Sequence, residues 1–136
     1  MNNGCPFCDP EEMRSRIVME TEHFYVVPTK GQIVEGYVLV IPKRHAACYG
    51  DLPEAELAEA EGILARLRTA ITDEYGQAPI VWEHGIIGQT VKHGHIHVFP
   101  CAPDLKEAIA AKFPDNEPMK ALDELREVFR REGPYL

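Results

Sequence analysis

Three histidines at alternate positions form the most reactive group of side chains in this sequence. His93, His95 and His97 lie in the run KHGHIHVFP, separated by Gly94 and Ile96. If the run is a β-strand, the three imidazoles share one face, about 6 to 7 Å apart. Imidazole titrates near neutral pH, binds metals and attacks phosphorus. The alternation with apolar residues indicates a functional site rather than a purification tag, which would be an unbroken run at a terminus.

Such a row suits covalent catalysis at phosphorus. A phosphate diester or anhydride resists attack by water because its oxygens carry negative charge, so a neutral imidazole is the better first nucleophile. One ring nitrogen must face phosphorus while the other is held by an acceptor, and on a strand a backbone carbonyl can serve.

A second group of reactive side chains is the pair Cys5 and Cys8 in the segment CPFC. This spacing lets one turn offer two thiolates to tetrahedral zinc, which then needs two further nitrogen or sulfur ligands. Taken alone, it fits two buried or redox-active cysteines equally well. The chain has four cysteines and no signal-peptide pattern, which favours reduced thiols. Cys48 and Cys101 are expected to pack in the interior.

Composition favours one globular domain whose ligands are small. The 136 residues are 45% hydrophobic, which suits a single core. A net charge of −8 argues against a broad basic surface for nucleic acid, so small phosphate compounds are the expected polyanions. No apolar run approaches the roughly 18 residues of a membrane span, so no membrane partner and a cytoplasmic location are expected.

The elements that position these side chains are mostly strands. A sheet of about five antiparallel strands is predicted, with strands over residues 16–20, 23–28, 37–42, 80–83 and 92–100. The first two should form a tight hairpin. The third is almost continuously apolar and should lie centrally in the sheet.

One long helix is predicted over residues 52–75. Apolar residues recur there every three or four positions, at Leu57, Ala60, Leu64, Leu67 and Ile71. Pro53 begins the helix and Gly76 ends it. The helix should pack on the sheet face opposite the histidines.

Two helices should follow Pro100, one after Asp104 and one containing Leu122, Leu125 and Phe129. The prediction is a single α+β domain over residues 1–136, with a cysteine-containing segment at 1–15, a core at 16–100 and C-terminal helices at 101–133.

The segment GQTVKHGHIHVFP resembles the signature of the histidine triad (HIT) superfamily, and GQTVKH closely resembles its fragile-histidine-triad branch. Gly94 replaces one apolar residue of the signature. A looser resemblance covers residues 16–100. The resemblance to the superfamily implies a HIT-like fold. It also implies a nucleotidyl hydrolase or transferase, usually homodimeric, that acts on a small nucleotide substrate.

The resemblance also implies roles for individual residues. His95 would be the nucleophile that forms a covalent nucleotidyl-histidine intermediate, which water then hydrolyses. His97 would contact the phosphate or assist the leaving group. Gln89 and Thr90 match positions whose side chains hold the phosphate and the bridging oxygen.

A structural zinc site follows from the same resemblance. His45 lies in PKRH, where some members and the related galactose-1-phosphate uridylyltransferases carry a zinc ligand. The implied Zn²⁺ ligands are Cys5, Cys8, His45 and His93, a filled set that leaves no position for water.

Three functions stay open at this point. The first is a hydrolase of a dinucleoside polyphosphate, a nucleoside phosphoramidate or another nucleotide conjugate. The second is a nucleotidyltransferase or phosphorylase, although the uridylyltransferases carry glutamine at the position of His97. The third is a nucleotide-binding zinc protein without turnover.

Overall fold

The computed structural model describes residues 4–29, 36–83, 91–100, 111 and 121–132. Its single sheet has the strand order β1-β2-β3-β5-β4, and every neighbouring pair is antiparallel. The strands are β1 (Met19–Glu20), β2 (Phe24–Pro28), β3 (Val38–Pro42), β4 (Pro79–Glu83) and β5 (Ile96–Pro100). The predicted α+β architecture, the β1–β2 hairpin and the central place of β3 are confirmed.

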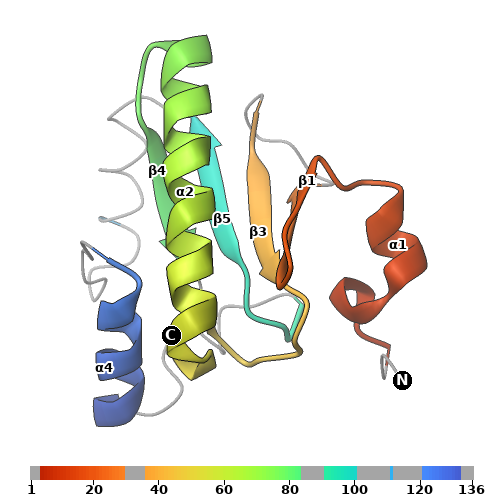
Figure 1. Ribbon diagram of the computed structural model, residues 1–136, viewed down its shortest axis with the longest axis vertical. Helices are drawn as coiled ribbons and strands as arrows, with labels where there is room; N and C mark the ends of the chain where they lie inside the picture. Colours follow the sequence, from red (N-terminus) through yellow and green to blue (C-terminus); the bar gives the residue numbers. More distant parts are fainter. Residues whose placement is uncertain (1–3, 30–35, 84–90, 101–110, 112–120, 133–136) are drawn as a thin grey trace.

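Helix α2 (Glu54–Tyr75) covers one face of the sheet (Figure 1). All five of its predicted apolar residues are buried against that face, together with Ile96 and Val98 of β5. The helix begins after Pro53 and ends at Gly76, whose N–H donates to the carbonyl of Thr72 and whose positive φ of 74° turns the following chain out of the helix. No helix in the described residues is long and apolar enough to cross a membrane.

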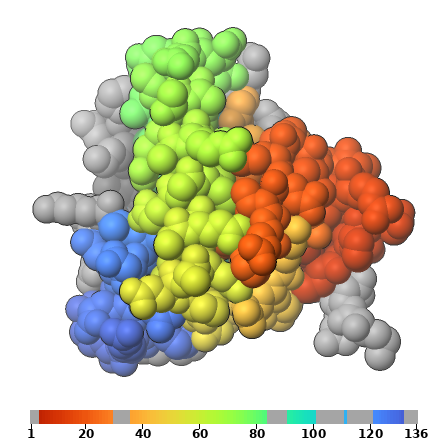
Figure 2. Space-filling model, viewed as in Figure 1, coloured from red at the N-terminus to blue at the C-terminus, as the bar shows by residue number. Residues whose placement is uncertain are grey.

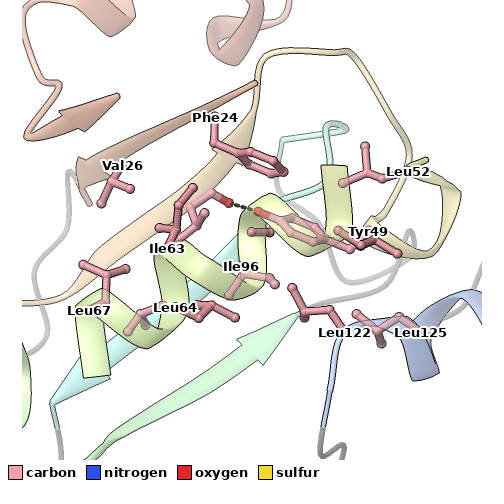
Figure 3. Packing of buried hydrophobic residues seen from close by; sticks show 14 of the residues in the cluster. Phe24, Val26, Tyr49, Leu52, Ile63, Leu64, Leu67, Ile96, Leu122 and Leu125 are labelled. Atoms are coloured by element: carbon pink, nitrogen blue, oxygen red, sulfur yellow. Dashed lines mark hydrogen bonds between the residues drawn. The ribbon is translucent and has the colours of Figure 1, made fainter. Parts of the chain in front are cut away.

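Tyr49 lies inside the core between α2 and the sheet (Figure 3). Its ring is fully buried, and its hydroxyl donates to the carbonyl oxygen of Val40 at 2.7 Å, which satisfies the polar end of the side chain. Leu125 of helix α4 (Asp123–Glu132) and Leu122, which directly precedes the helix, are also buried in this core. The second predicted C-terminal helix is thus confirmed, whereas the one expected after Asp104 lies outside the described residues.

The N-terminal segment packs on the other face of the sheet. It contains the 3-10 helix η1 (Pro6–Cys8) and helix α1 (Pro10–Arg14), which contribute Phe7 and Met13 to a second apolar cluster with strand residues such as Leu39. Figure 2 shows α2 between this segment on one side and α4 on the other. His97 is paired with Leu39 of the second cluster, so it lies on the sheet face opposite α2, as predicted.

Strand β1 is shorter than the predicted 16–20. The backbone N–H of Arg16 donates to the carbonyl of Met13 at 2.9 Å and so extends the turn after α1. Bonding to β2 starts at Val18, whose N–H donates to Val26. The hairpin is therefore restricted to its last residues.

The prediction of one continuous strand over residues 92–100 is wrong. Strand β5 begins at Ile96, so His97 is the only histidine of the row that lies on it. The chain before it is diverted because the N–H of Gly94 donates to the carbonyl of Ala46 at 2.7 Å. A Cβ on Gly94 would come within 2.9 Å of the Cα of Cys48, which explains why glycine replaces the apolar residue of the signature.

Candidate functional site

Four side chains from three parts of the chain come together beside the sheet. Two are in the N-terminal segment, one is in the loop after β3, and one is in the segment before β5. They are Cys5, Cys8, His45 and His93, and their ligand atoms lie within 4.8 Å of one another. The Nδ1 atoms of the two histidines are 3.2 Å apart, and the Sγ of Cys8 is 3.2 and 3.4 Å from them. Ligands of tetrahedral zinc lie roughly 3.3 to 3.8 Å apart. The cluster could hold a metal ion, and its donor atoms and spacing suit zinc.

His93 is fully buried, and hydrogen bonding orients its ring. Its Nε2–H donates to the carbonyl oxygen of Pro42 at 2.7 Å, which leaves the Nδ1 lone pair directed at the cysteines. Burial, helped by the charges of His45 and His95, lowers the pKa of His93 to about 4. The neutral ring that results is the form that binds a metal.

The thiol of Cys8 keeps its proton at neutral pH unless a cation binds beside it. Without one, burial together with the hydrogen bond and charge of Cys5 would raise the pKa of Cys8 to about 11. A bound cation reverses that effect, because it stabilises the thiolate directly.

His95 lies just before β5 and is also buried, with 7% of its surface exposed. Its Nδ1 is 2.7 Å from the carbonyl oxygen of His93. Because a carbonyl only accepts, Nδ1 carries the proton and the lone pair of the neutral ring is on Nε2. Phe7, between the two cysteines, contacts the rings of His93 and His95 edge to face, at centroid distances of 5.7 and 5.1 Å.

His97 lies on β5, opposite Leu39 of β3 on one side and Trp82 of β4 on the other. Its ring is 4.9 Å from that of His95, centroid to centroid. Its Nδ1 is 2.5 Å from the hydroxyl oxygen of Tyr37. The last two histidines of the row are therefore neighbours, as predicted, although the strand begins between them.

An imidazole with a defined lone pair thus lies next to a second imidazole and to a cluster that could hold a metal ion. Residues 10–104 match the family model described as the HIT domain, and this span contains His45 and the whole histidine row. The chain belongs to the HIT domain family.

Individual relatives support the same assignment. An adenosine 5′-monophosphoramidase of Saccharomyces cerevisiae is 31% identical over 121 residues, which are 86% of this chain and 74% of the relative. A nitrilase and fragile histidine triad fusion protein of Caenorhabditis elegans is 30% identical over 74% of this chain and 22% of its own length. A histidine triad nucleotide-binding protein of Sulfolobus tokodaii, described as hypothetical, has a similar structure, with a TM-score of 0.62, 26% identity and coverage of 95% and 97% of the two chains.

At the level of the HIT family, the chain is a nucleotide hydrolase or transferase, which confirms the predicted class of enzyme. Gln89 and Thr90 lie outside the described residues, so their predicted contacts with phosphate stay predictions. Cys48 is fully buried, as expected, and it is not part of the cluster.

Sequence reasoning missed two residues of this site, Phe7 and Tyr37. Phe7 could have been suspected, because the cysteine motif places it beside the proposed metal ligands. Tyr37 resembles an ordinary strand residue in sequence, and only the pairing of β3 with β5 brings it to His97.

Proposed function

We propose that this HIT protein is a nucleotidyl hydrolase in which His95 forms a covalent nucleotidyl-histidine intermediate. The observation that carries the proposal is the hydrogen bond between Nδ1 of His95 and the carbonyl of His93. It assigns the lone pair of the buried ring to Nε2, the nitrogen required for attack. The second imidazole, His97, lies beside it to interact with the phosphoryl group.

The reaction consists of two displacements at phosphorus. In the first, the Nε2 lone pair of His95 forms a bond to phosphorus while the bond to the leaving group breaks, and the leaving group departs with the bonding electron pair and takes up a proton. In the second, the oxygen of a water molecule attacks the same phosphorus and loses a proton. The nitrogen–phosphorus bond breaks, which releases a nucleoside monophosphate and restores the neutral imidazole.

The substrate class is a nucleotide conjugate, either a nucleoside phosphoramidate or a dinucleoside polyphosphate. The yeast relative is named an adenosine 5′-monophosphoramidase, which favours a phosphoramidate. The GQTVKH segment favours the fragile-histidine-triad branch instead, with Gln89 and Thr90 binding the phosphate and the bridging oxygen. We propose both conjugates as substrates. We also propose that the protein forms the homodimer that the family resemblance implies.

Hydrolysis assays with both substrate types test the function. We expect the wild-type protein to release a nucleoside monophosphate from at least one of them, and His95→Asn to reduce kcat by at least about 1000-fold, because the nucleophile is lost. His23→Asn is the matched control, since it makes the same change at a histidine outside the site. Full activity of His95→Asn would refute the mechanism, and transfer to added phosphate in preference to water would favour a phosphorylase.

We also propose that Cys5, Cys8, His45 and His93 bind one structural Zn²⁺. The proposal is supported by the four converging donor atoms and by the bond from His93 to Pro42, which orients the ring. Zinc supplies no reaction step here, because four protein ligands fill its coordination shell. It connects the N-terminal segment to the chain that carries the nucleophile.

A further inference from the structure

We propose that Tyr37 is a positioning residue that fixes the tautomer of His97. In this arrangement the proton of the neutral His97 ring is on Nε2, from which it donates a hydrogen bond to the phosphoryl group of the substrate. The inference rests on the proposed nucleotidyl transfer at His95, and it adds a residue from another strand to the histidine row.

The side chain of Tyr37 is held firmly in place. The residue directly precedes β3 and is only 8% exposed. Its ring meets Phe99 of β5 edge to face at 4.8 Å, and its hydroxyl oxygen is 2.5 Å from Nδ1 of His97. Because Val38 pairs with Val98, Tyr37 lies diagonally across the β3–β5 pair from His97, on the same face of the sheet.

The direction of this hydrogen bond follows from the chemistry of the two groups. Burial raises the pKa of Tyr37, so the phenol keeps its proton at neutral pH. A phenol O–H is a stronger acid than the N–H of a neutral imidazole, and an imidazole nitrogen is a stronger base than a phenol oxygen, so the phenol is the better donor of this pair. The phenol O–H therefore donates, Nδ1 of His97 accepts, and the proton of the neutral imidazole is on Nε2.

Two adjacent imidazoles thus take opposite tautomers because their partners differ. A carbonyl accepts from His95, which leaves a lone pair on Nε2, whereas a phenol donates to His97, which leaves an N–H there. The first ring can attack phosphorus, and the second can stabilise the negative charge of the phosphoryl oxygens. Without the hydroxyl, His97 would also populate the tautomer whose Nε2 lone pair repels an anionic phosphate.

Nitrogen-15 NMR of histidine-labelled protein tests the assignment without any substrate. We expect the wild-type spectrum to show His97 protonated on Nε2 and unprotonated on Nδ1, and Tyr37→Phe to shift it toward a mixture of tautomers. Tyr25→Phe is the matched control, because it removes a hydroxyl from a tyrosine packed against the same apolar cluster. A wild-type His97 protonated on Nδ1, or a Tyr37→Phe spectrum equal to that of wild type, would overturn the proposal.

Kinetics test the consequence for the reaction. Tyr37→Phe should lower kcat by roughly 3- to 10-fold, the effect of one hydrogen bond, with metal content unchanged. An unchanged kcat would overturn the role of Tyr37 in catalysis. If the wild-type protein hydrolyses neither substrate type while the NMR signature is present, the proposed function fails and the tautomer assignment stands.

Discussion

At the scale of single residues, Gly94 shows how one missing side chain shapes the site. Its N–H bonds to Ala46, and its Cα faces the backbone of Cys48 with no room for a Cβ. The close approach brings the loop after β3, which carries His45, against the residues around His93. The departure from the family signature is therefore a packing requirement of this chain.

We expect Gly94→Ala to destabilise the protein by about 1 to 3 kcal/mol, because the new methyl group must displace backbone atoms. Denaturant unfolding measures the change. Gly62→Ala is the matched control: Gly62 lies in α2 with nothing near its missing Cβ, so alanine should stabilise by about 0.4 to 1 kcal/mol. Equal stability of Gly94→Ala and wild type would show that the loop is not tightly packed there.

At the scale of elements, Glu59 of α2 clamps the turn between β1 and β2. Its carboxylate accepts from the hydroxyl of Thr21, from the backbone N–H of His23 at 2.9 Å and from Nδ1 of His23 at 2.7 Å. The bond to Glu59 raises the pKa of His23, and the nearby carboxylate of Glu22 adds to it. Burial alone would raise the pKa of Glu59, but the bonds from Thr21 and His23 outweigh it and lower the value.

This clamp should make stability depend on pH. The contribution of His23 to the free energy of unfolding is fully present below its ordinary pKa near 6.5, and it is lost as pH rises through its raised folded pKa. That of Glu59 is full above its ordinary pKa near 4.5 and is lost as pH falls through its lowered folded pKa. The stability difference between wild type and Glu59→Gln should therefore be largest between about pH 4.5 and 6.5.

Unfolding measured across that pH range, with Glu74→Gln as an exposed control on the same helix, checks the expectation. A difference between wild type and Glu59→Gln that does not vary with pH would contradict the ionic character of the clamp.

The proposed zinc joins segments that are distant in sequence, so its loss should lower the stability of the whole domain. We expect about one zinc per chain in wild type purified without added metal, and almost none in Cys8→Ala. A chelator should lower the melting temperature of wild type only, because metal binding contributes to folding.

Cys48→Ala is the control for this prediction, since Cys48 is a buried cysteine outside the cluster and its variant should retain the metal. Metal-free wild type, or a full zinc content in Cys8→Ala, would exclude the site.

At the scale of the whole molecule, periodic patterns predicted the fold well. The spacing of apolar residues predicted α2 to within two residues, and the apolar run before Lys43 predicted the central strand. These features are local, because they follow from the repeat of one helix face or one sheet face. The metal cluster became predictable only when the family resemblance linked Cys5 and Cys8 to His45 and His93.

The parts that were not predicted depend on contacts between distant segments. The histidine strand starts at Ile96 rather than at residue 92 because Gly94 bonds to Ala46, 48 positions earlier, and no local pattern contains that contact. The hydrogen bond from Tyr37 to His97 likewise requires the pairing of β3 with β5. The proposed tautomer of His97 therefore depends on a contact between distant segments, whereas that of His95 depends on a local bond to the carbonyl of His93.

The central claim is that His95 becomes covalently bonded to the nucleotide, and mass spectrometry of the protein during its first turnover tests it most directly. The wild-type protein is mixed with an excess of a substrate that it hydrolyses, then quenched over a series of times under alkaline conditions, which spare a phosphorus–nitrogen bond. We predict a nucleotidyl group on the peptide that contains His95, formed before the nucleoside monophosphate appears and absent from His95→Asn. A complete first turnover with no nucleotide on His95 at any quench time, or with the nucleotide on another residue, would contradict the account.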